Sequence, residues 1–308
     1  MRQTCLDSVY EIAKTDPRVF FIGSDLGIGT LQKFKDEMPE RYYMEGVSEA
    51  NLIGISAGLA LENKIVYACT IATFLTRRCF EQVCLDLCLH KVRVRLIGNG
   101  GGLVYAPLGP THLATEDMAI FRSLPHMTIL APADKTEMKR LMPATVDHDG
   151  PIYIRLAKGS TDPIVTRDEP FVIGKIYPMR EGDGALIVST GITLKYALKA
   201  AEDLAAKGIE AAILHCPTVK PLDESVIREY AAKVPIIITI EEGTIVGGLG
   251  SAVAEIISEA NFPTPKKFRR IGIPDVFPDQ YGSQDTLLAR YDISSDRIVA
   301  TVEQLAGK

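Results

Sequence analysis

One carboxylate in this sequence stands where parallel α/β proteins usually carry out chemistry. Glu49 lies in the segment Gly46-Val47-Ser48-Glu49-Ala50-Asn51, between the end of a strand and an apolar stretch, residues 50–61, with helical spacing. Ligands of parallel sheets bind outside the carboxyl ends of the strands, so a carboxylate here is a candidate acid or base. The alternative is a first-turn Glu that only interacts with the helix dipole, because acidic residues are enriched in first turns.

Other patterns that suggest chemistry are incomplete. Gly247-Gly248-Leu249-Gly250 lies between a strand and a helix but lacks the G-x-G-x-x-G spacing of a dinucleotide site. Gly182-Asp183-Gly184 stands in a charged segment before a strand, which favours a turn. The six cysteines show neither the C-x-x-C spacing nor the cysteine–histidine spacing of a zinc site, so we interpret them as free thiols in a reducing compartment.

The first half of the chain alternates buried strands with helices. The predicted strands share short apolar runs: 19–23, 65–70, 92–98, 127–130 and 151–155. The predicted helices share amphipathic or small-residue spacing: 50–61, 74–90, about 115–122, and one after Asp134. This alternation predicts a mostly parallel sheet covered by helices on both faces.

A second α/β series follows a stretch of prolines, charges and turns at 157–180, which is typical of a linker. Its predicted strands are apolar runs at 185–189, 209–214, 235–240 and 267–271. Its predicted helices are periodic segments at 194–207, 224–233, 248–260 and 296–305. The sequence therefore predicts two doubly wound α/β domains, 1–172 and a smaller 173–308.

Composition excludes several classes of protein. The chain has 308 residues, 46% of them hydrophobic and 24% charged, as in soluble globular proteins. Asp and Glu (39) outnumber Lys and Arg (34), which argues against a nucleic-acid or membrane-surface binder. No apolar run approaches the roughly 20 residues of a membrane span, and the first residues do not read as a secretory signal. We therefore expect a cytoplasmic protein.

Four segments in order resemble the transketolase family of thiamine-diphosphate enzymes. Residues 46–54 resemble its thiamine-pyrimidine-binding segment, and residues 73–82 resemble the aromatic-bearing helix that holds the aminopyrimidine. Gly109-Pro110-Thr111-His112 resembles the substrate-histidine loop, and Glu241-Glu242-Gly243 with residues 247–250 resembles the third-domain motif. Because the match covers essentially the whole chain in order, a chance resemblance is improbable.

The resemblance assigns five residues to the cofactor. Glu49 corresponds to the family Glu that hydrogen-bonds the pyrimidine ring nitrogen and drives proton transfer within the cofactor. Phe74 and Phe80 would flank or stack on the pyrimidine, with Arg77 one turn from Phe74 on the same helix. Asp25 matches a family Asp near the cofactor and the dimer contact. The alternative for both Phe residues is a role in the core, because aromatics at helical spacing usually pack there.

The resemblance also assigns two residues to the substrate. His112 would contact the substrate hydroxyls or carbonyl oxygen and serve in catalysis beside Glu49, since His can titrate near neutrality. Arg155, at the end of a strand, resembles the substrate-phosphate arginine and could offer a bidentate fork. The alternatives are a turn-capping His and a simple surface Arg.

The resemblance further implies a partner chain. Complete transketolases contain a diphosphate-binding domain whose G-D-G…N motif ligates a divalent metal, and none of the matching segments belongs to it. We therefore expect thiamine diphosphate as cofactor, with Mg²⁺ or another divalent metal bound mainly by an N-terminal-section subunit and no metal ligand in this chain. In the superfamily the cofactor lies between domains of different protomers, which implies self-association and an α2β2 heterotetramer.

The implied activity is that of a transketolase subunit, a transferase of aldehyde or ketone residues in carbohydrate metabolism. It would move a two-carbon ketol unit from a ketose or phosphoketose to an aldose or aldehyde acceptor. Two departures bear on the sugar: Leu108 stands where an Asp commonly precedes G-P-T-H, and Gly243 stands where His often follows the two Glu residues. The alternatives are a β-type E1 subunit of a 2-oxo acid dehydrogenase, a 1-deoxyxylulose-5-phosphate synthase-like section, and a degenerate regulatory subunit.

Overall fold

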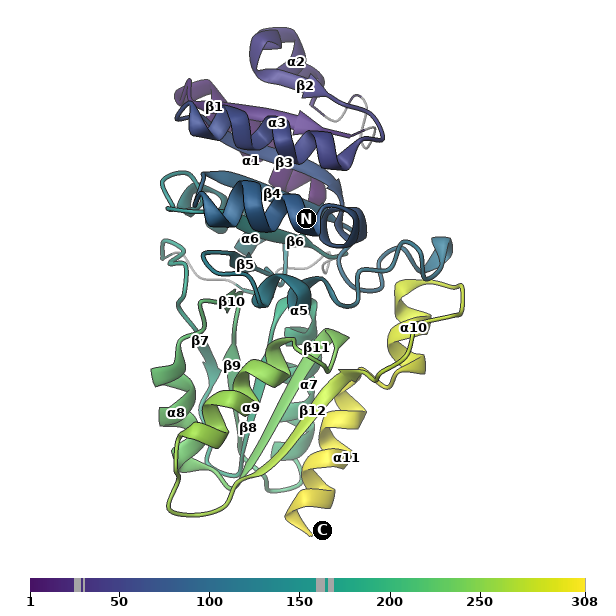
Figure 1. Ribbon diagram of the computed structural model, residues 1–308. Coiled ribbons are helices and arrows are strands. Elements are labelled where there is room, and N and C mark those ends of the chain that lie inside the picture. Colours follow the sequence, from purple (N-terminus) through teal and green to yellow (C-terminus); the bar gives the residue numbers. More distant parts are fainter. Residues whose placement is uncertain (25–28, 30, 159–163, 166–168, 308) are drawn as a thin grey trace. The chain divides into compact units, whose positions relative to one another are not determined.

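The computed structural model describes residues 1–24, 29, 31–158, 164, 165 and 169–307, which form two compact α/β units (Figure 1). The first unit consists of residues 1–101 and 120–173, and the second of residues 102–119 and 174–308. Each unit is built on a mainly parallel sheet with helices packed against it, which confirms the predicted fold class. No helix in the described ranges is both long and apolar enough to cross a membrane.

The sheet of the first unit has the strand order β5-β6-β4-β3-β1-β2, and every neighbouring pair in this series is parallel. The strands are β1 (Val19–Gly23), β2 (Tyr42–Met44), β3 (Ile65–Ile71), β4 (Val94–Asn99), β5 (Thr128–Leu130) and β6 (Ile152–Leu156). Every residue of β4, β5 and β6 is buried, as expected for strands covered on both faces. The shared direction brings the carboxyl ends of these strands to one edge.

The helices up to residue 144 are α1 (Arg2–Thr15), α2 (Gln32–Glu37), α3 (Glu49–Leu61), α4 (Phe80–Gln82), α5 (Asp117–Arg122) and α6 (Lys135–Ala144), with short 3₁₀ turns η1 (Pro39–Arg41) and η4 (Ala106–Leu108). Helices α1 and α6 pack together, while α3 packs on β3 (Figure 1). The single helix predicted for residues 74–90 was wrong. It is divided into a π-helical turn η2 (Phe74–Arg78), α4, and a second π-helical segment η3 (Val83–Leu89). The break falls at Cys79, whose φ of −107° and ψ of 15° leave helical geometry.

The second unit has the strand order β12-β11-β8-β9-β7, all parallel except β7 against β9. Its strands are β7 (Tyr177–Arg180), β8 (Ala185–Ser189), β9 (Ala211–His215), β10 (Thr218–Lys220), β11 (Ile236–Thr244) and β12 (Lys267–Ile273). Its helical segments are η5 (Gly191–Thr193), α7 (Leu194–Ala205), α8 (Glu224–Lys233), α9 (Leu249–Glu259), α10 (Gln284–Arg290) and α11 (Ser295–Ala306). Helices α7 and α11 pack together, as do α8 and α9.

Strand β7 falls where the sequence predicted only a linker. It is an antiparallel edge strand that contains Pro178, and its side chains are mostly half-buried. Proline is tolerated at sheet edges because it cannot donate a ladder hydrogen bond. Strand β7 has the sequence Tyr-Pro-Met-Arg and is only partly buried, so it lacks the apolar run by which the other strands were predicted. Gly182-Asp183-Gly184 lies before β8 and includes a bend, in agreement with the predicted turn.

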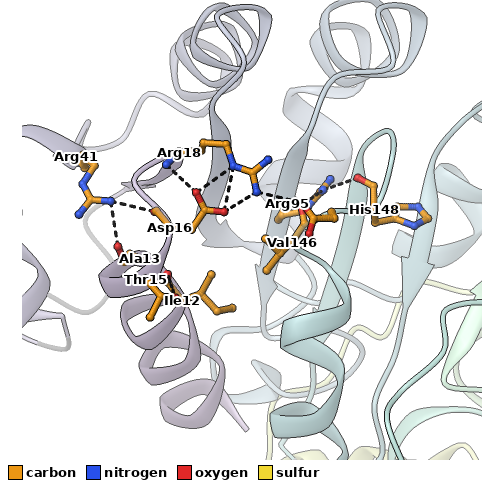
Figure 2. A network of polar contacts seen from close by, with 10 residues as sticks. Ile12, Ala13, Thr15, Asp16, Arg18, Arg41, Arg95, Val146 and His148 are labelled. Carbon is orange, nitrogen blue, oxygen red and sulfur yellow. Dashed lines mark hydrogen bonds and ion pairs between the residues drawn. The ribbon is translucent and has the colours of Figure 1, made fainter.

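A polar network closes the amino ends of the strands in the first unit (Figure 2). Arg95, in β4, is fully buried, and its guanidinium donates to three backbone carbonyls of the loop 146–150 at 2.6–3.1 Å. Burial lowers the pKa of Arg95 to about 10. Nearby, Arg18 donates to Asp16 at the end of α1. This network lies at the opposite end of the strands from the edge where parallel sheets bind ligands, so its role is structural.

Candidate active site

Glu49 is the first residue of α3, at the carboxyl edge of the first sheet. The preceding strand β2 ends at Met44, and the next residues turn the chain into the helix. Ser48 precedes Glu49 but does not cap the helix, because its Oγ donates to the carbonyl of Glu45 at 2.8 Å. The side chain of Glu49 is only 3% exposed. A buried carboxylate must be paired or hydrogen-bonded, and the helix N-terminus stabilises it only in part.

The partner of Glu49 is Arg78. Its Nη1 donates to Oε2 of Glu49 at 2.6 Å, a short charge-assisted hydrogen bond. The guanidinium also lies over the ring of Phe74, with its central carbon 4.8 Å from the ring centroid. Arg78 itself is 50% exposed, so one side of this cluster is open to solvent. The contacts of Glu49 within the described residues use Oε2, which leaves Oε1 for a further partner.

The sequence analysis named Arg77 as a cofactor residue, whereas the arginine that pairs with Glu49 is its neighbour Arg78. Arg77 is exposed, and the guanidinium that reaches Glu49 comes from the next residue. Phe74 and Arg78 are the first and last residues of the π-helical turn η2, four positions apart, so both lie on the same face. π-Helical turns are frequent at functional sites. Phe74 is half-buried and Phe80 is 36% exposed, so neither ring is fully enclosed in the core.

Cys79 follows Arg78 directly in the sequence, and its thiol is expected to be unreactive. Its thiol is buried. Burial first, and then the negative charge of Glu49, raises the pKa of Cys79 to about 12. The thiolate is the nucleophilic form of cysteine. Cys79 therefore packs as a small apolar side chain near neutral pH and does not compete with Glu49 for chemistry.

Three buried polar side chains that were not predicted from the sequence line the same edge of the sheet. Ser24 follows β1, Thr73 follows β3, and Asn99 ends β4. Each is at most 1% exposed. Within the described residues, Ser24 Oγ, Thr73 Oγ1 and Asn99 Oδ1 have no hydrogen-bond partner. These three residues could have been predicted from the sequence, because each is a polar residue at or just after the end of a predicted strand. Unpartnered buried polar atoms are costly, and a polar ligand at this edge would offset that cost.

Arg155 is buried, so the alternative of a simple surface Arg was wrong. It lies in β6 opposite Gly98 of β4 and is 4% exposed. Its side chain crosses Gly101 so closely that a Cβ on that glycine would lie 2.5 Å from Arg155 Cγ. The glycine-rich loop after β4 thus leaves room for the arginine. Asp25, the remaining predicted residue of the first unit, lies outside the described residues.

His112 lies in a turn of the segment 102–119, which belongs to the second unit. Its backbone N–H donates to the carbonyl of Gly109 at 3.0 Å, and its Nδ1 lies 2.9 Å from Thr111 Oγ1. The imidazole is half-buried. Gly109 has a φ of +77°, and a Cβ at this position would lie 2.7 Å from the ring of Tyr281. The positive φ of Gly109 and the nearby ring of Tyr281 favour glycine at this position of the turn that carries His112.

The two glutamates of the third-domain motif have structural contacts in the second unit. Glu241 accepts hydrogen bonds from the backbone N–H groups of Leu249 and Gly250, at 3.0 and 2.7 Å, and thereby caps α9. Glu242 accepts from the N–H of Leu103 at 2.9 Å and from Gln284 at 2.6 Å. Both side chains are 1% exposed. Through these hydrogen bonds the motif connects β11 with the start of α9, with Leu103 and with the start of α10.

Two family models match this chain and decide its family. Residues 1–163 match the transketolase pyrimidine-binding domain, and residues 174–298 match the transketolase C-terminal domain. The chain belongs to the transketolase family. The first match also groups it with the thiamine-diphosphate-dependent enzymes.

Three proteins similar to this chain are named as transketolase subunits or as a split-gene transketolase. The chain is 36% identical over 309 residues to the 6-deoxy-6-sulfo-D-fructose transketolase subunit SqwH of Clostridium sp. (strain MSTE9), covering 100% of this chain and 95% of that protein. It is 34% identical to a subunit of the apulose-4-phosphate transketolase of Phocaeicola vulgatus, covering 100% of this chain and 97% of that subunit. A solved split-gene transketolase, an inactive β4 tetramer, superposes with a TM-score of 0.89 at 32% identity, covering 98% of this chain and 97% of that one. This chain is therefore similar, over nearly its whole length, to proteins named as transketolase subunits.

The residues of this transketolase-family chain fit the pyrimidine half of thiamine diphosphate. Glu49 offers a buried carboxylate whose Oε1 can accept a ring nitrogen's proton. The hydroxyls of Ser24 and Thr73 are buried at the same edge of the sheet and have no hydrogen-bond partner among the described residues. The partly exposed ring of Phe74 offers an aromatic face. Among the described residues, no three His, Cys, Asp or Glu side chains are grouped as a metal site would require.

Proposed function

We propose that this chain is the pyrimidine-binding subunit of a thiamine-diphosphate-dependent transketolase. The enzyme transfers a two-carbon ketol unit from a ketose to an aldose or aldehyde acceptor. The observation that carries the proposal is the buried Glu49 carboxylate at the start of α3, held by Arg78 beside the ring of Phe74. When bound, thiamine diphosphate supplies the carbon nucleophile and electron sink for cleavage and formation of the carbon–carbon bond.

Glu49 is the residue that handles the cofactor's proton. Its Oε1 would accept a hydrogen bond from the pyrimidine ring nitrogen, while Oε2 keeps its bond to Arg78. Phe74 and Phe80 would hold the pyrimidine ring by aromatic contact. Arg77 and Asp25 remain candidates for cofactor contacts on the family resemblance alone. Glu49 is only 3% exposed, so water would reach its carboxylate poorly with a pyrimidine ring bound beside it.

The substrate is proposed to be a sugar with a terminal anionic group. Two relatives are named for such sugars, one sulfonated and one phosphorylated. Arg155 would bind this anion through its planar fork, a geometry suited to phosphate and similar oxyanions. His112 would contact the hydroxyls or carbonyl oxygen of the sugar. On this proposal Arg155 binds the anionic end of the sugar and His112 binds the end that reacts.

The diphosphate and its Mg²⁺ are proposed to be held by a partner subunit, the counterpart of the transketolase N-terminal section. The relatives named as subunits support this division, and the β4 tetramer of the solved relative supports self-association of this chain. We propose an α2β2 assembly in which each cofactor lies between a β pyrimidine domain and an α diphosphate domain.

The test is a two-carbon transfer assay with the purified chain, its partner subunit, thiamine diphosphate and Mg²⁺. We expect a ketose donor and an aldehyde acceptor to react only when both chains are present. Glu49→Gln keeps the size of the side chain but removes the carboxylate, so it should lower kcat at least about a hundredfold. Glu62→Gln, an exposed residue after the other end of α3, is the matched control and should keep full activity.

Each contrary result points to a specific alternative. Full activity of Glu49→Gln would overturn the role of Glu49. Release of carbon dioxide from a 2-oxo acid without ketose cleavage would reassign the chain to the E1 β-type branch. Condensation of pyruvate with glyceraldehyde phosphate would reassign it to the deoxyxylulose-phosphate synthase branch. No reaction in any of these assays would favour a regulatory subunit.

A further inference from the structure

A polar pocket of about 300 Å³ lies in the second unit, beside its edge strand. It is formed where β12, the last strand of the sheet, meets α11, and Figure 1 shows these two elements side by side. The volume is at the lower end of the range of small-molecule sites. None of the residues proposed above for cofactor or sugar binding lines it. The lining side chains are mainly cationic or polar: Arg269, Arg270, Arg297, Tyr291, Thr301 and Gln304.

The pocket carries an excess of positive charge. Three arginines line it, and Asp292 is the one carboxylate among the described lining residues. Asp292 neutralises little of this charge, because its carboxylate lies 3.7 Å from Arg297 Nε and both side chains are more than half exposed. Like-charged guanidinium groups repel each other. An arrangement of this kind is relieved by an anion.

The three guanidinium groups are held to different degrees. Arg270 is fixed, because its Nη1 donates to the carbonyl of Ile245 at 2.6 Å and to Ser251 Oγ at 3.0 Å. Arg269 makes one long hydrogen bond, 3.3 Å, to the carbonyl of Phe268. Arg297 has the weak contact with Asp292 described above. Arg269 and Arg297 are therefore able to turn their donors toward a ligand without breaking strong contacts.

The position of these two arginines also favours a bound oxyanion. Arg269 lies on the edge strand β12, and Arg297 lies in the first turn of α11, so they reach the pocket from two rigid elements. Guanidinium groups bind phosphate oxygens in bidentate pairs. Gln304 adds a side-chain amide to the same wall, whereas the hydroxyl of Thr301, one turn after Arg297, already donates to the carbonyl of Arg297 at 2.6 Å.

We infer that this pocket binds a small phosphate-bearing metabolite, with Arg269 and Arg297 as its main ligands. The pocket lies wholly in the C-terminal domain, and its occupancy does not depend on the transketolase reaction. Inorganic phosphate is the simplest probe, because it carries the group that the arginines recognise.

The experiment is isothermal titration of the purified chain with inorganic phosphate at constant ionic strength. We compare the unaltered chain with the double variant Arg269→Gln/Arg297→Gln. The matched control is Arg228→Gln/Lys233→Gln, which removes two exposed cations from α8 that are engaged in i,i+4 ion pairs. We expect phosphate binding to weaken at least about tenfold in the pocket variant and to stay unchanged in the control.

Three results would overturn the inference. The unaltered chain could bind no phosphate at millimolar concentration. The pocket variant could bind phosphate as tightly as the unaltered chain, which would locate binding elsewhere. The control could lose as much affinity as the pocket variant, which would mean diffuse charge attraction rather than a site. Circular dichroism of both variants checks that the exposed substitutions leave the fold intact.

Discussion

The ion pair between Glu49 and Arg78 is the contact on which the candidate site depends, and a double-mutant cycle measures it directly. The cycle consists of Glu49→Gln, Arg78→Gln and the combined variant. Glutamine keeps the approximate length of each side chain and removes its charge. A cycle isolates the pairwise energy, because effects that each substitution has separately cancel.

The expected coupling follows from the burial of the two partners. Breaking a fully buried ion pair costs about 3–5 kcal/mol, whereas an exposed pair contributes about 0–1 kcal/mol. Here the carboxylate is 3% exposed and the guanidinium 50% exposed, at 2.6 Å. Water can partly replace the arginine but reaches the carboxylate poorly, so we expect a coupling of about 1–2 kcal/mol. Arg78→Gln removes the cation–π contact with Phe74 whether residue 49 is Glu or Gln, so this loss cancels in the coupling energy.

Hydrogen exchange of backbone amides is the suitable assay, because a chain with two units need not unfold in one step. Exchange in α3 and in residues 74–89 reports the local opening free energy of the elements that carry the pair. A coupling of about 1–2 kcal/mol corresponds to a difference of about 5–30-fold in the opening constants. Peptides from the second unit should exchange equally in all four proteins.

The neighbouring arginine supplies the control. A second cycle with Arg77→Gln in place of Arg78→Gln should give a coupling near zero, because Glu49 is bonded to Arg78. If the two cycles give the same coupling, the ion pair is only a general charge effect. If neither cycle exceeds about 0.3 kcal/mol, the limit of additivity for independent sites, the reasoning about this site is refuted.

Two further perturbations test the structure. Glu241→Ala removes the acceptor of two N–H groups at the start of α9, so we expect a loss of about 2 kcal/mol in the opening free energy of α9 by hydrogen exchange; a loss below about 0.5 kcal/mol would contradict the capping role. Burial, and then the charge of Arg95, lowers the pKa of His148. The neutral form therefore stabilises the fold above the unfolded pKa near 6.5, and this stability is lost as pH falls through the folded pKa. Thermal unfolding at about pH 7.5 and about pH 5 should show a smaller acid-induced loss for His148→Gln than for the unaltered chain, and equal losses would refute this.

The two α/β series could be predicted from sequence because parallel strands are buried on both faces. Such strands appear as short apolar runs, and β1, β3 and β8 were located to within a residue or two. Elements without that pattern were not found. Strand β2, Tyr42–Met44, is short and half-exposed at the sheet edge, and α1 at the start of the chain has a polar composition. The buried residues Leu6, Val9 and Ala13 of α1 do recur at helical spacing, so this helix was missed although its pattern is present in the sequence.

The candidate site was predicted in part. A carboxylate before an apolar helix identified Glu49, and its burial is a fact that the sequence could not supply. The family resemblance assigned Arg77 to the cofactor, and the pairing of Arg78 with Glu49 was not predicted. A regular α-helix was expected, on which either arginine is close to Phe74. The π-helical turn and the break at Cys79 give Arg78 the position over the ring.

The glycines of the loop after β4 have a physical explanation that no motif provided. Gly101 leaves space for the side chain of Arg155, and Gly102 leaves space for the carboxylate of Glu242. Gly102 also has a φ of +67°, a conformation that other residues rarely adopt. A glycine-rich loop after a parallel strand suggests phosphate binding from sequence alone. Here these two glycines make room for buried charged side chains, whose positions lie far away in the sequence.

The contacts that orient Glu49 all lie within one unit of this chain. Its helix, its ion-pair partner and the adjacent ring of Phe74 all belong to the first unit of this chain. The carboxylate is therefore oriented by contacts that this sequence forms by itself. Preorganised side chains reduce the ordering cost of binding. On the proposed function, the partner need supply only the diphosphate and metal anchor, because the groups for the pyrimidine are already in place.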